Sequence, residues 1–354
     1  MSRTMPLSVQ SMRPSPAHYP WIRRWLNLCL ALVVLMVLIG GLTRLTESGL
    51  SIVEWKLFSG ILPPMSQQGW EREFAAYQTS PEFKQVNSNF SLGDFKRIFW
   101  LEYIHRVLGR VIGLALVVPF LFFAARRMLP RRLFWRMAFA CVLVASQGTV
   151  GWIMVASGLE DQPRVNPLKL ALHLSLALSL FCTLLWTRWQ IAPGSRPSGL
   201  AYTGRALRLL LIVAAIQIVF GALVAGLDAG YSYNTFPLMD GRFVPSDLHL
   251  LSPWWLNHLE NIRTVQFQHR IGAYATVACC LLAAMLHWKH ALPSQRRAFL
   301  MLGGAIFLQF ALGVATLLSV MNIALASAHQ LGALLMLTVL LWIIWLFPLR
   351  MGRN

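Results

Sequence analysis

Eight long apolar runs constrain this chain more than any other feature of its sequence. A run of about 20 apolar residues, wound as a helix, crosses the roughly 30 Å of hydrocarbon in a bilayer. Only 12% of the 354 residues are charged, against about a quarter in a typical soluble protein. The sequence therefore predicts an all-α polytopic membrane protein with eight transmembrane helices. These lie near residues 25–44, 99–125, 133–156, 168–187, 206–227, 264–286, 298–320 and 323–347, with a tight turn at 319–322.

The positive charge of the chain is distributed unevenly between the two sides of the predicted membrane. The termini and the segments on their side hold 18 of the 31 Lys and Arg residues and none of the 13 acidic residues. Cytoplasmic segments of membrane proteins carry this excess of basic residues. The net charge of +18 therefore indicates orientation in a lipid membrane, not binding of nucleic acid. We expect both termini in the cytoplasm, or on the equivalent inner side of an organelle membrane. The short tail, without an extended Arg/Ser-rich presequence, favours a bacterial inner membrane.

The two halves of the chain resemble each other at a spacing of about 160 residues. This repeat predicts two pseudo-symmetric four-helix bundles, related by an axis along the membrane normal. We expect a cytoplasmic tail at 1–24, an N-terminal half at 25–195 and a C-terminal half at 196–354. The matching segments are 40–51 with 221–232, His105-Arg106 with His269-Arg270, 147–151 with 309–313, and His173 with His329.

A long outer segment, residues 45–98, separates the first two spans. Ser80 followed by Pro81 predicts the start of a short helix. Ser91 with Asp94 resembles a capping box, in which each residue caps the other. We expect short interfacial helices over the outer mouth of the N-terminal half, the second of which continues into the second span.

Four of the nine histidines lie inside predicted spans that run from outside to inside. His105, His173, His269 and His329 each follow the outer start of a span by a few residues, so all four lie roughly 8 to 10 Å below the outer surface. A single such ring is more often hydrogen-bonded to a neighbouring helix. Four rings at matched depth instead indicate axial ligands of haem iron. We expect His105 with His173 to form one haem site and His269 with His329 the other.

The other histidines and the cysteines carry no metal-binding pattern. We expect surface positions for His18, His249, His258, His287 and His290. The five cysteines all fall within predicted spans, where a packing role is expected: Cys29, Cys141, Cys182, Cys279 and Cys280.

A carboxylate distinguishes the two histidine motifs. Glu102 lies three residues before His105, and Gln266 takes the same place before His269. A carboxylate one helical turn from a haem ligand supplies an acid/base or cation-stabilising group. The N-terminal half is therefore the expected reactive site, and the C-terminal half the electron relay. The alternative role for Glu102 is a salt bridge with Arg106, four residues later.

Three arginines lie near the outer ends of the histidine-bearing spans. Arg106 and Arg110 belong to the second span, and Arg270 belongs to the sixth. Each guanidinium could pair with a haem propionate. Anchoring in the lipid headgroups is an equally good interpretation.

Five motifs resemble those of the haem A synthase family, above all its proteobacterial and mitochondrial branch. They are TESGLSIVEW at 46–55, EYIHR at 102–106, YNTFPLMDG at 233–241, FQHRIGAYA at 267–275 and SAHQLGA at 327–333. The resemblance extends from about residue 25 to 345. Other branches carry a cysteine pair in the first outer segment, which this chain lacks, so no thiol-dependent step carries over.

The resemblance implies oxidation of a methyl group of haem O to the formyl group of haem A, for cytochrome oxidase. It implies that His105 and His173 bracket the substrate haem, that His269 and His329 ligate haem b, and that Glu102 is essential. Glu102 would either shuttle protons or stabilise a cationic carbon. The resemblance implies two partner proteins, an unidentified electron donor and a haem O synthase with which this protein would form a complex. A homo-oligomer is a further expectation.

Two other functions compete with haem A synthesis. A di-haem b-type, quinol-linked electron-transfer protein would usually place its haems toward opposite membrane faces, whereas these four histidines share one depth. A transporter built from repeats would need broken helices and polar groups near the membrane midplane, where these spans are apolar.

Overall fold

The computed structural model describes residues 19–55, 59–160, 163–191, 204–289 and 291–346. Eight of its helices are long and apolar enough to cross a membrane, which confirms the predicted number of spans. They are α1 (Tyr19–Leu45), α4 (Leu92–Ala125), α5 (Arg131–Ala156), α6 (Pro167–Gln190), α7 (Gly204–Gly226), α9 (Ile262–Trp288), α10 (Pro293–Leu318) and α11 (Ile323–Leu346). The turn between α10 and α11 lies where the sequence placed it. Helix α1 begins six residues before the predicted span, inside the predicted tail.

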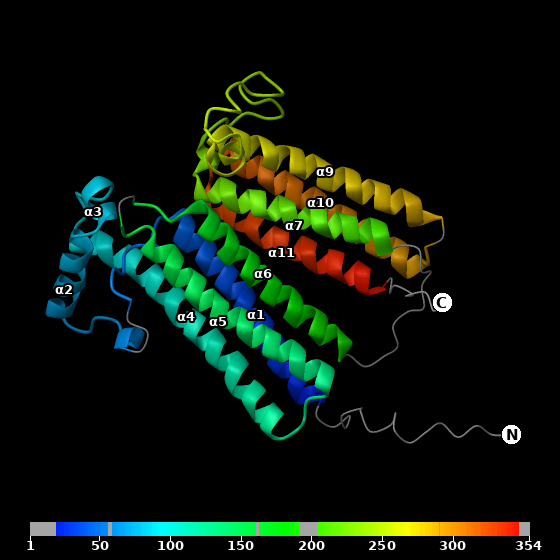
Figure 1. Cartoon of the computed structure of the whole chain (residues 1–354), viewed down its shortest axis with the longest axis horizontal. Coiled ribbons are helices and arrows are strands. Elements are labelled where there is room, and N and C mark those ends of the chain that lie inside the picture. The colour runs from blue at the N-terminus through cyan, green and yellow to red at the C-terminus, as the bar shows by residue number, and fades with distance from the viewer. Residues whose placement is uncertain (1–18, 56–58, 161–162, 192–203, 290, 347–354) are drawn as a thin grey trace.

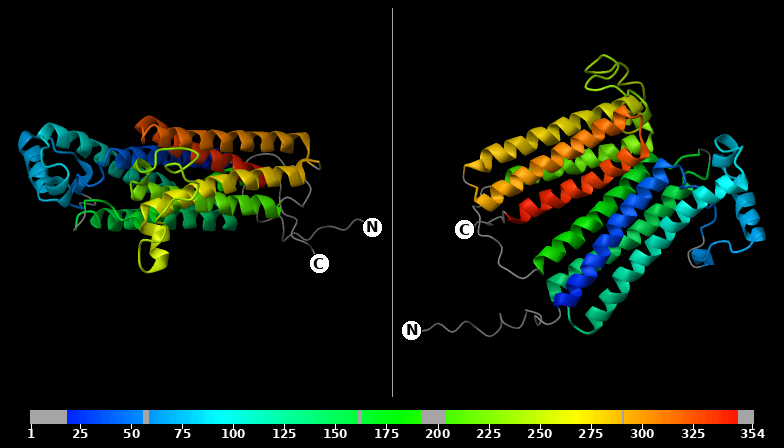
Figure 2. Two further views of the ribbon diagram at one scale, coloured as in Figure 1. Left: turned by 90° about the horizontal axis from the view of Figure 1, so that it is seen from above. Right: turned by 180° about the vertical axis from the view of Figure 1, so that it is seen from behind.

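The long helices form two groups of four (Figures 1 and 2). Helices α1, α4, α5 and α6 make the N-terminal group, and α7, α9, α10 and α11 make the C-terminal group. Each group buries its own apolar cluster, the first around Leu116 and Met137 and the second around Leu210 and Leu302. The groups meet where α1 and α6 contact α7 and α11. A pseudo-symmetry axis between the groups stays a prediction.

The first outer segment packs against the outer end of α4. Ser80 caps α3 (Pro81–Gln85), and Ser91 and Asp94 form the expected capping box, from which α4 runs without a break into the second span. Helix α2 (Gln67–Gln78), capped by Ser66, was not predicted. An aromatic cluster of Trp70, Tyr77, Phe95 and Phe99 holds α2 and α3 in place. The capping signals alone therefore located two of the three helix starts.

The second outer segment joins α7 to α9. It contains two short 3-10 helices, η5 (Ala229–Tyr231) and η6 (Trp254–Leu256), and the single turn α8 (Asn257–Glu260). The side chain of Asn257 is buried and bonds to the backbone of Leu251 and Trp254. These polar contacts within the segment therefore fix the shape of its own backbone.

One of the expected surface histidines is buried. His287 is only 9% exposed, its Nδ1 lies 2.6 Å from the Ala283 carbonyl, and its ring stacks on Phe299. The prediction was wrong because His287 occupies the face of α9 that packs against α10. His249 is exposed and His258 half-buried, while His18 and His290 lie outside the described residues. All five cysteines are free and buried or half-buried.

Glu82 is a buried carboxyl group in the first outer segment. Tyr77 donates a hydrogen bond to it at 3.0 Å, and Asn87 donates to the Tyr77 hydroxyl at 2.8 Å. No Lys or Arg of the described ranges forms an ion pair with Glu82. Burial raises the pKa of Glu82 from 4.5 to about 7. The ionised form is therefore disfavoured in the folded protein.

Glu82→Gln should stabilise the outer segment at high pH. Because the pKa of Glu82 is higher in the folded state than in the unfolded state, the folded state binds more protons between pH 4.5 and 7. The stability of the wild-type segment therefore falls as the pH rises through this range. Glutamine keeps an acceptor for Tyr77 and removes the ionisation. We expect a stability gain of about 3 kcal/mol at pH 8 and almost none at pH 4.5, measured by hydrogen exchange of α2 and α3. The exposed Glu71→Gln is the control, and equal gains at both pH values would contradict this account.

Candidate functional site

One cavity of about 910 Å³ extends between the two helix groups. All four histidines in the spans line it, together with Glu102 and Gln266. The structure therefore brings every predicted histidine ligand to a single continuous space, in the outer half of the helices that carry them.

The rings of His269 and His329 face each other across the C-terminal part of this cavity. Their centres are 6.5 Å apart, and their planes are nearly perpendicular at 88°. A metal–imidazole bond is about 2 Å long, so two rings that ligate one metal from opposite sides have centres roughly 6 Å apart. The separation of the two ring centres therefore fits one iron atom between the rings.

Each of the four histidines lies against a glycine of the neighbouring helix. A Cβ atom on these glycines would come within 2.8 to 3.1 Å of the facing ring, tighter than nine in ten real Cβ contacts, and at Gly313 closer than real Cβ atoms come. A larger residue would therefore push the facing ring aside, most of all at Gly313. The pairs are Gly40 with His105, Gly151 with His173, Gly221 with His269, and Gly313 with His329. The same contact between a histidine ring and a glycine, called the glycine cradle below, occurs on all four helix pairs. This repetition is consistent with one shared role for the four rings.

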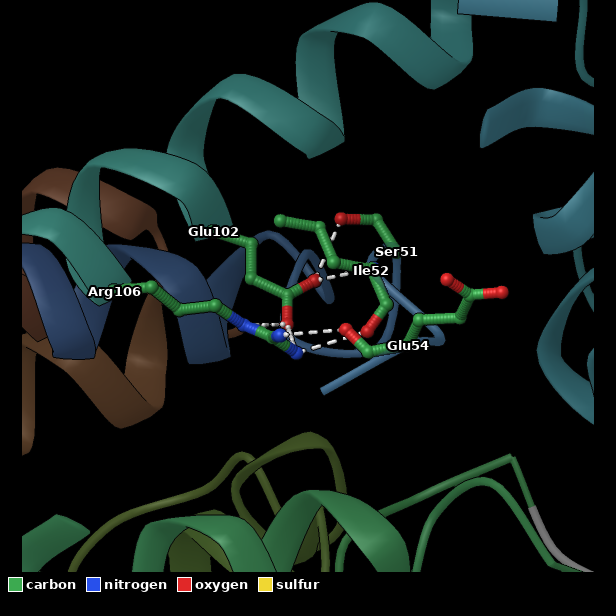
Figure 3. A network of polar contacts seen from close by, with 5 residues as sticks. All are labelled: Ser51, Ile52, Glu54, Glu102 and Arg106. Atoms are coloured by element: carbon green, nitrogen blue, oxygen red, sulfur yellow. Dashed lines mark hydrogen bonds and ion pairs between the residues drawn. The ribbon is translucent and has the colours of Figure 1, made fainter. Parts of the chain in front are cut away.

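Glu102 accepts four hydrogen bonds at the outer end of the N-terminal site (Figure 3). The Ser51 hydroxyl and the Ile52 backbone N–H donate to Oε2 at 2.6 and 2.8 Å. Arg106 donates to Oε1 from Nη2 at 2.6 Å and from Nε at 3.0 Å. The carboxylate is only 2% exposed. The salt bridge considered as the alternative role is thus present, and it holds Glu102 at the cavity wall.

Gln266 occupies the corresponding place in the C-terminal half. Its side chain is buried and donates to the carbonyls of Ala229 and Ser232 at 2.9 and 2.5 Å. Ser51 and Ser232 are also matching residues of the repeated segments. The two halves therefore share one arrangement at this point, with a carboxylate in the first and a neutral amide in the second.

Arg106 and Arg270 each bind backbone carbonyls of the outer segment above their own site. Arg106 donates to Ile52 at 2.9 Å. Arg270 donates to Tyr233 at 2.6 Å and to Thr235 at 2.9 Å. Arg110 lines both the large cavity and a smaller pocket beneath the first outer segment. The sequence did not predict these contacts with backbone carbonyls, because an irregular stretch of backbone has no recognisable residue pattern. Contact with propionates stays a prediction.

Two polar contacts that the sequence did not suggest join the halves. Arg44 of α1 forms an ion pair with Asp228 at 2.5 Å and also donates to the Ala225 carbonyl. Gln330 of α11 donates to the Val37 carbonyl at 2.7 Å. Both lie on the cavity wall, so the halves are fixed to each other next to the histidines.

Known proteins are similar to this chain over most of its length. Residues 23–341 match the COX15-CtaA family model, described as cytochrome oxidase assembly protein. The heme A synthase of Nitrosospira multiformis is 44% identical over 328 residues, 90% of this chain and 91% of the relative. Those of Bradyrhizobium diazoefficiens and Parvibaculum lavamentivorans are 46% and 42% identical, over 91% and 94% of this chain and 90% and 96% of theirs. The chain belongs to the COX15-CtaA family of cytochrome oxidase assembly proteins.

Proposed function

We propose that this protein oxidises a methyl group of haem O to the formyl group of haem A, the reaction of a haem A synthase. The observation that carries the proposal is the set of four histidines, each cradled by a glycine, that line one cavity. Relatives named heme A synthase, at 42 to 46% identity over about 90% of both chains, support it.

His269 and His329 would hold a resident haem b, and His105 and His173 would bracket the substrate haem O. The separation of the His269 and His329 rings supports the first assignment. The carboxylate beside His105 supports the second, because chemistry at a carbon atom needs an acid/base group that electron transfer does not. A bound haem b supplies one-electron transfer, and the electron acceptor or donor outside the protein is unidentified.

Written as a half-reaction with water, the conversion of a methyl group to a formyl group gives four protons and four electrons, and an oxidant outside the protein has to take up the electrons. Those protons need an acceptor near the reacting carbon, and Glu102 is the buried carboxylate next to His105. Oε1 of Glu102 accepts from the Arg106 guanidinium, whereas Oε2 accepts from the Ser51 hydroxyl. A hydroxyl can turn from donor to acceptor. We assign proton acceptance to Oε2, with Ser51 rotating to accept the new O–H. Stabilisation of a cationic carbon is the alternative role for Glu102.

Pigment analysis tests the proposed function. The protein should be produced in cells that make haem O but have no haem A synthesis of their own, and its haems extracted and separated. Haem A together with haem b is expected. Haem b alone would favour the di-haem electron carrier, and the absence of haem would favour a transporter. Both alternatives explain the structure less well, since the four histidines share one cavity and the spans are long continuous helices.

The proposed location is a bacterial inner membrane, with both termini in the cytoplasm. The basic residues of the inner segments support this orientation. Haem O is too apolar to cross water alone, so direct transfer from a haem O synthase in a complex is part of the proposal. Formation of a homo-oligomer remains a prediction.

A further inference from the structure

The first outer segment has an apolar tip, residues 59–65, that lies along the side of α4. The Tyr103 hydroxyl of α4 donates to the Ile61 carbonyl of the tip at 2.5 Å. Leu62 of the tip also lines the smaller pocket together with Tyr103 and Arg110. The tip therefore lies level with residues that follow the start of α4 by three turns or more.

The depth of this position in the membrane follows from the length of α4. The helix ends at Ala125, and the basic residues Arg126 and Arg127 follow it, as is typical at the edge of the hydrocarbon. Tyr103 lies about 33 Å from that end, at a rise of about 1.5 Å per residue. The hydrocarbon is about 30 Å thick, and the headgroups extend the bilayer to about 40–45 Å. Tyr103 and the tip beside it are therefore level with the boundary between the outer headgroups and the acyl chains.

The composition of the tip suits this boundary. Leu62 is 77% exposed and Met65 is 85% exposed, and residues 57–70 include no charged residue. Pro63 and Pro64 have no backbone N–H. Two backbone donors whose exposure to lipid would be costly are thus missing from the tip. Such a segment gains free energy by moving its side chains from water into the upper part of the acyl chains.

The surroundings of the tip point to lipid as its neighbour. It lies on the flank of α4 that faces away from the other long helices (Figures 1 and 2). Next to it, α4 exposes three apolar side chains that lie on one stripe of the helix, Trp100, Ile104 and Val111. An apolar stripe on the outside of a membrane-spanning helix faces acyl chains. The exposed side chains of the tip therefore continue a lipid-facing surface of α4.

We propose that residues 59–65 insert into the outer leaflet of the membrane, with Leu62 and Met65 among the upper acyl chains of the phospholipids. The partner of this surface is the lipid bilayer and not another protein. The inserted tip would hold the first outer segment beside α4, where preceding residues of the same segment bind Glu102. The inference does not depend on the reaction that the protein catalyses.

Photolabelling from the lipid tests the insertion in the unmodified protein. One copy of the protein per nanodisc is placed in phosphatidylcholine that carries a diazirine in the upper part of one acyl chain. After irradiation, mass spectrometry locates the lipid adducts. Adducts on residues 61–65 should be about as frequent as adducts on Val111. They should be several-fold more frequent than adducts on Asn89, which is exposed and precedes the start of α4.

Leu62→Asp provides the second arm of the test. Because Leu62 is mostly exposed, its replacement should leave the folded core unchanged, and thermal unfolding in detergent checks this. A charged side chain is costly among acyl chains, so the adducts on the tip should fall several-fold. Gln68→Asp, at an exposed position of α2, is the control and should leave the adducts at the wild-type level.

Two results would overturn the insertion. One is a wild-type protein without lipid adducts on residues 61–65, which would make the tip a docking surface for another protein. The other is an unchanged yield of adducts on the tip in Leu62→Asp.

Discussion

Glu102→Gln is expected to reduce haem A formation by about 100-fold or more, while the haem content of the protein stays at the wild-type level. The substitution gives the N-terminal site the residue that the C-terminal site carries at Gln266. An amide keeps the size of the side chain but can neither accept a proton at neutral pH nor hold a negative charge. Both proposed roles of Glu102 are therefore lost, while the histidines and their glycines are untouched.

Haem A and haem O extracted from the purified variant give the measurement. Glu71→Gln makes the same chemical change at an exposed position of α2, where the carboxylate accepts a hydrogen bond from Gln67, and it should behave as the wild type. Full conversion by Glu102→Gln would remove this carboxylate from the chemistry.

The Arg106 ion pair needs its own comparison, because Glu102→Gln also leaves a half-buried guanidinium without its carboxylate. If Glu102 served only to pair with Arg106, Arg106→Gln would cost as much as Glu102→Gln, and the double variant would recover activity. We expect instead that Arg106→Gln keeps measurable conversion and that the double variant is as inactive as Glu102→Gln. This double-mutant cycle separates the role of Glu102 in the reaction from its structural role as the partner of Arg106.

Gly313→Val is expected to lower the haem b content of the protein by about tenfold or more, and haem A formation with it. A Cβ at this position would lie 2.8 Å from the His329 ring, so the ring must move away from the His269 ring that it faces. Because a metal bridging the two rings needs both nitrogens near 2 Å, a displaced His329 leaves the iron with one axial ligand.

Gly304→Val on the same helix is the matched control, since no atom lies within 4 Å of a Cβ built there. Haem b is measured per protein after purification, with thermal unfolding as a check that both variants fold. Equal haem content in the two variants would show that the glycine cradle does not position the ring.

Hydrophobicity, helix capping and histidine spacing made much of the fold and site predictable from sequence. The eight spans follow from runs of apolar residues, and the start of α4 follows from the pairing of Ser91 with Asp94. These are local signals, carried by neighbouring residues. The equal depth of the four histidines is also local, since it depends only on where each span begins.

Contacts between distant segments could not be predicted in this way. The carbonyl contacts of Arg106 and Arg270 and the Arg44–Asp228 pair each join residues far apart in sequence. His287 was misassigned for the same reason, because one sequence does not reveal which face of α9 meets α10.

The arginine contacts with the outer segments have a consequence for substitutions within those segments. Arg106 and Arg270 recognise main-chain oxygens, which every amino acid provides, so the side chains at Ile52 and Tyr233 take no part in those bonds. Substitution of either side chain therefore leaves these hydrogen bonds in place as long as the main chain keeps its path.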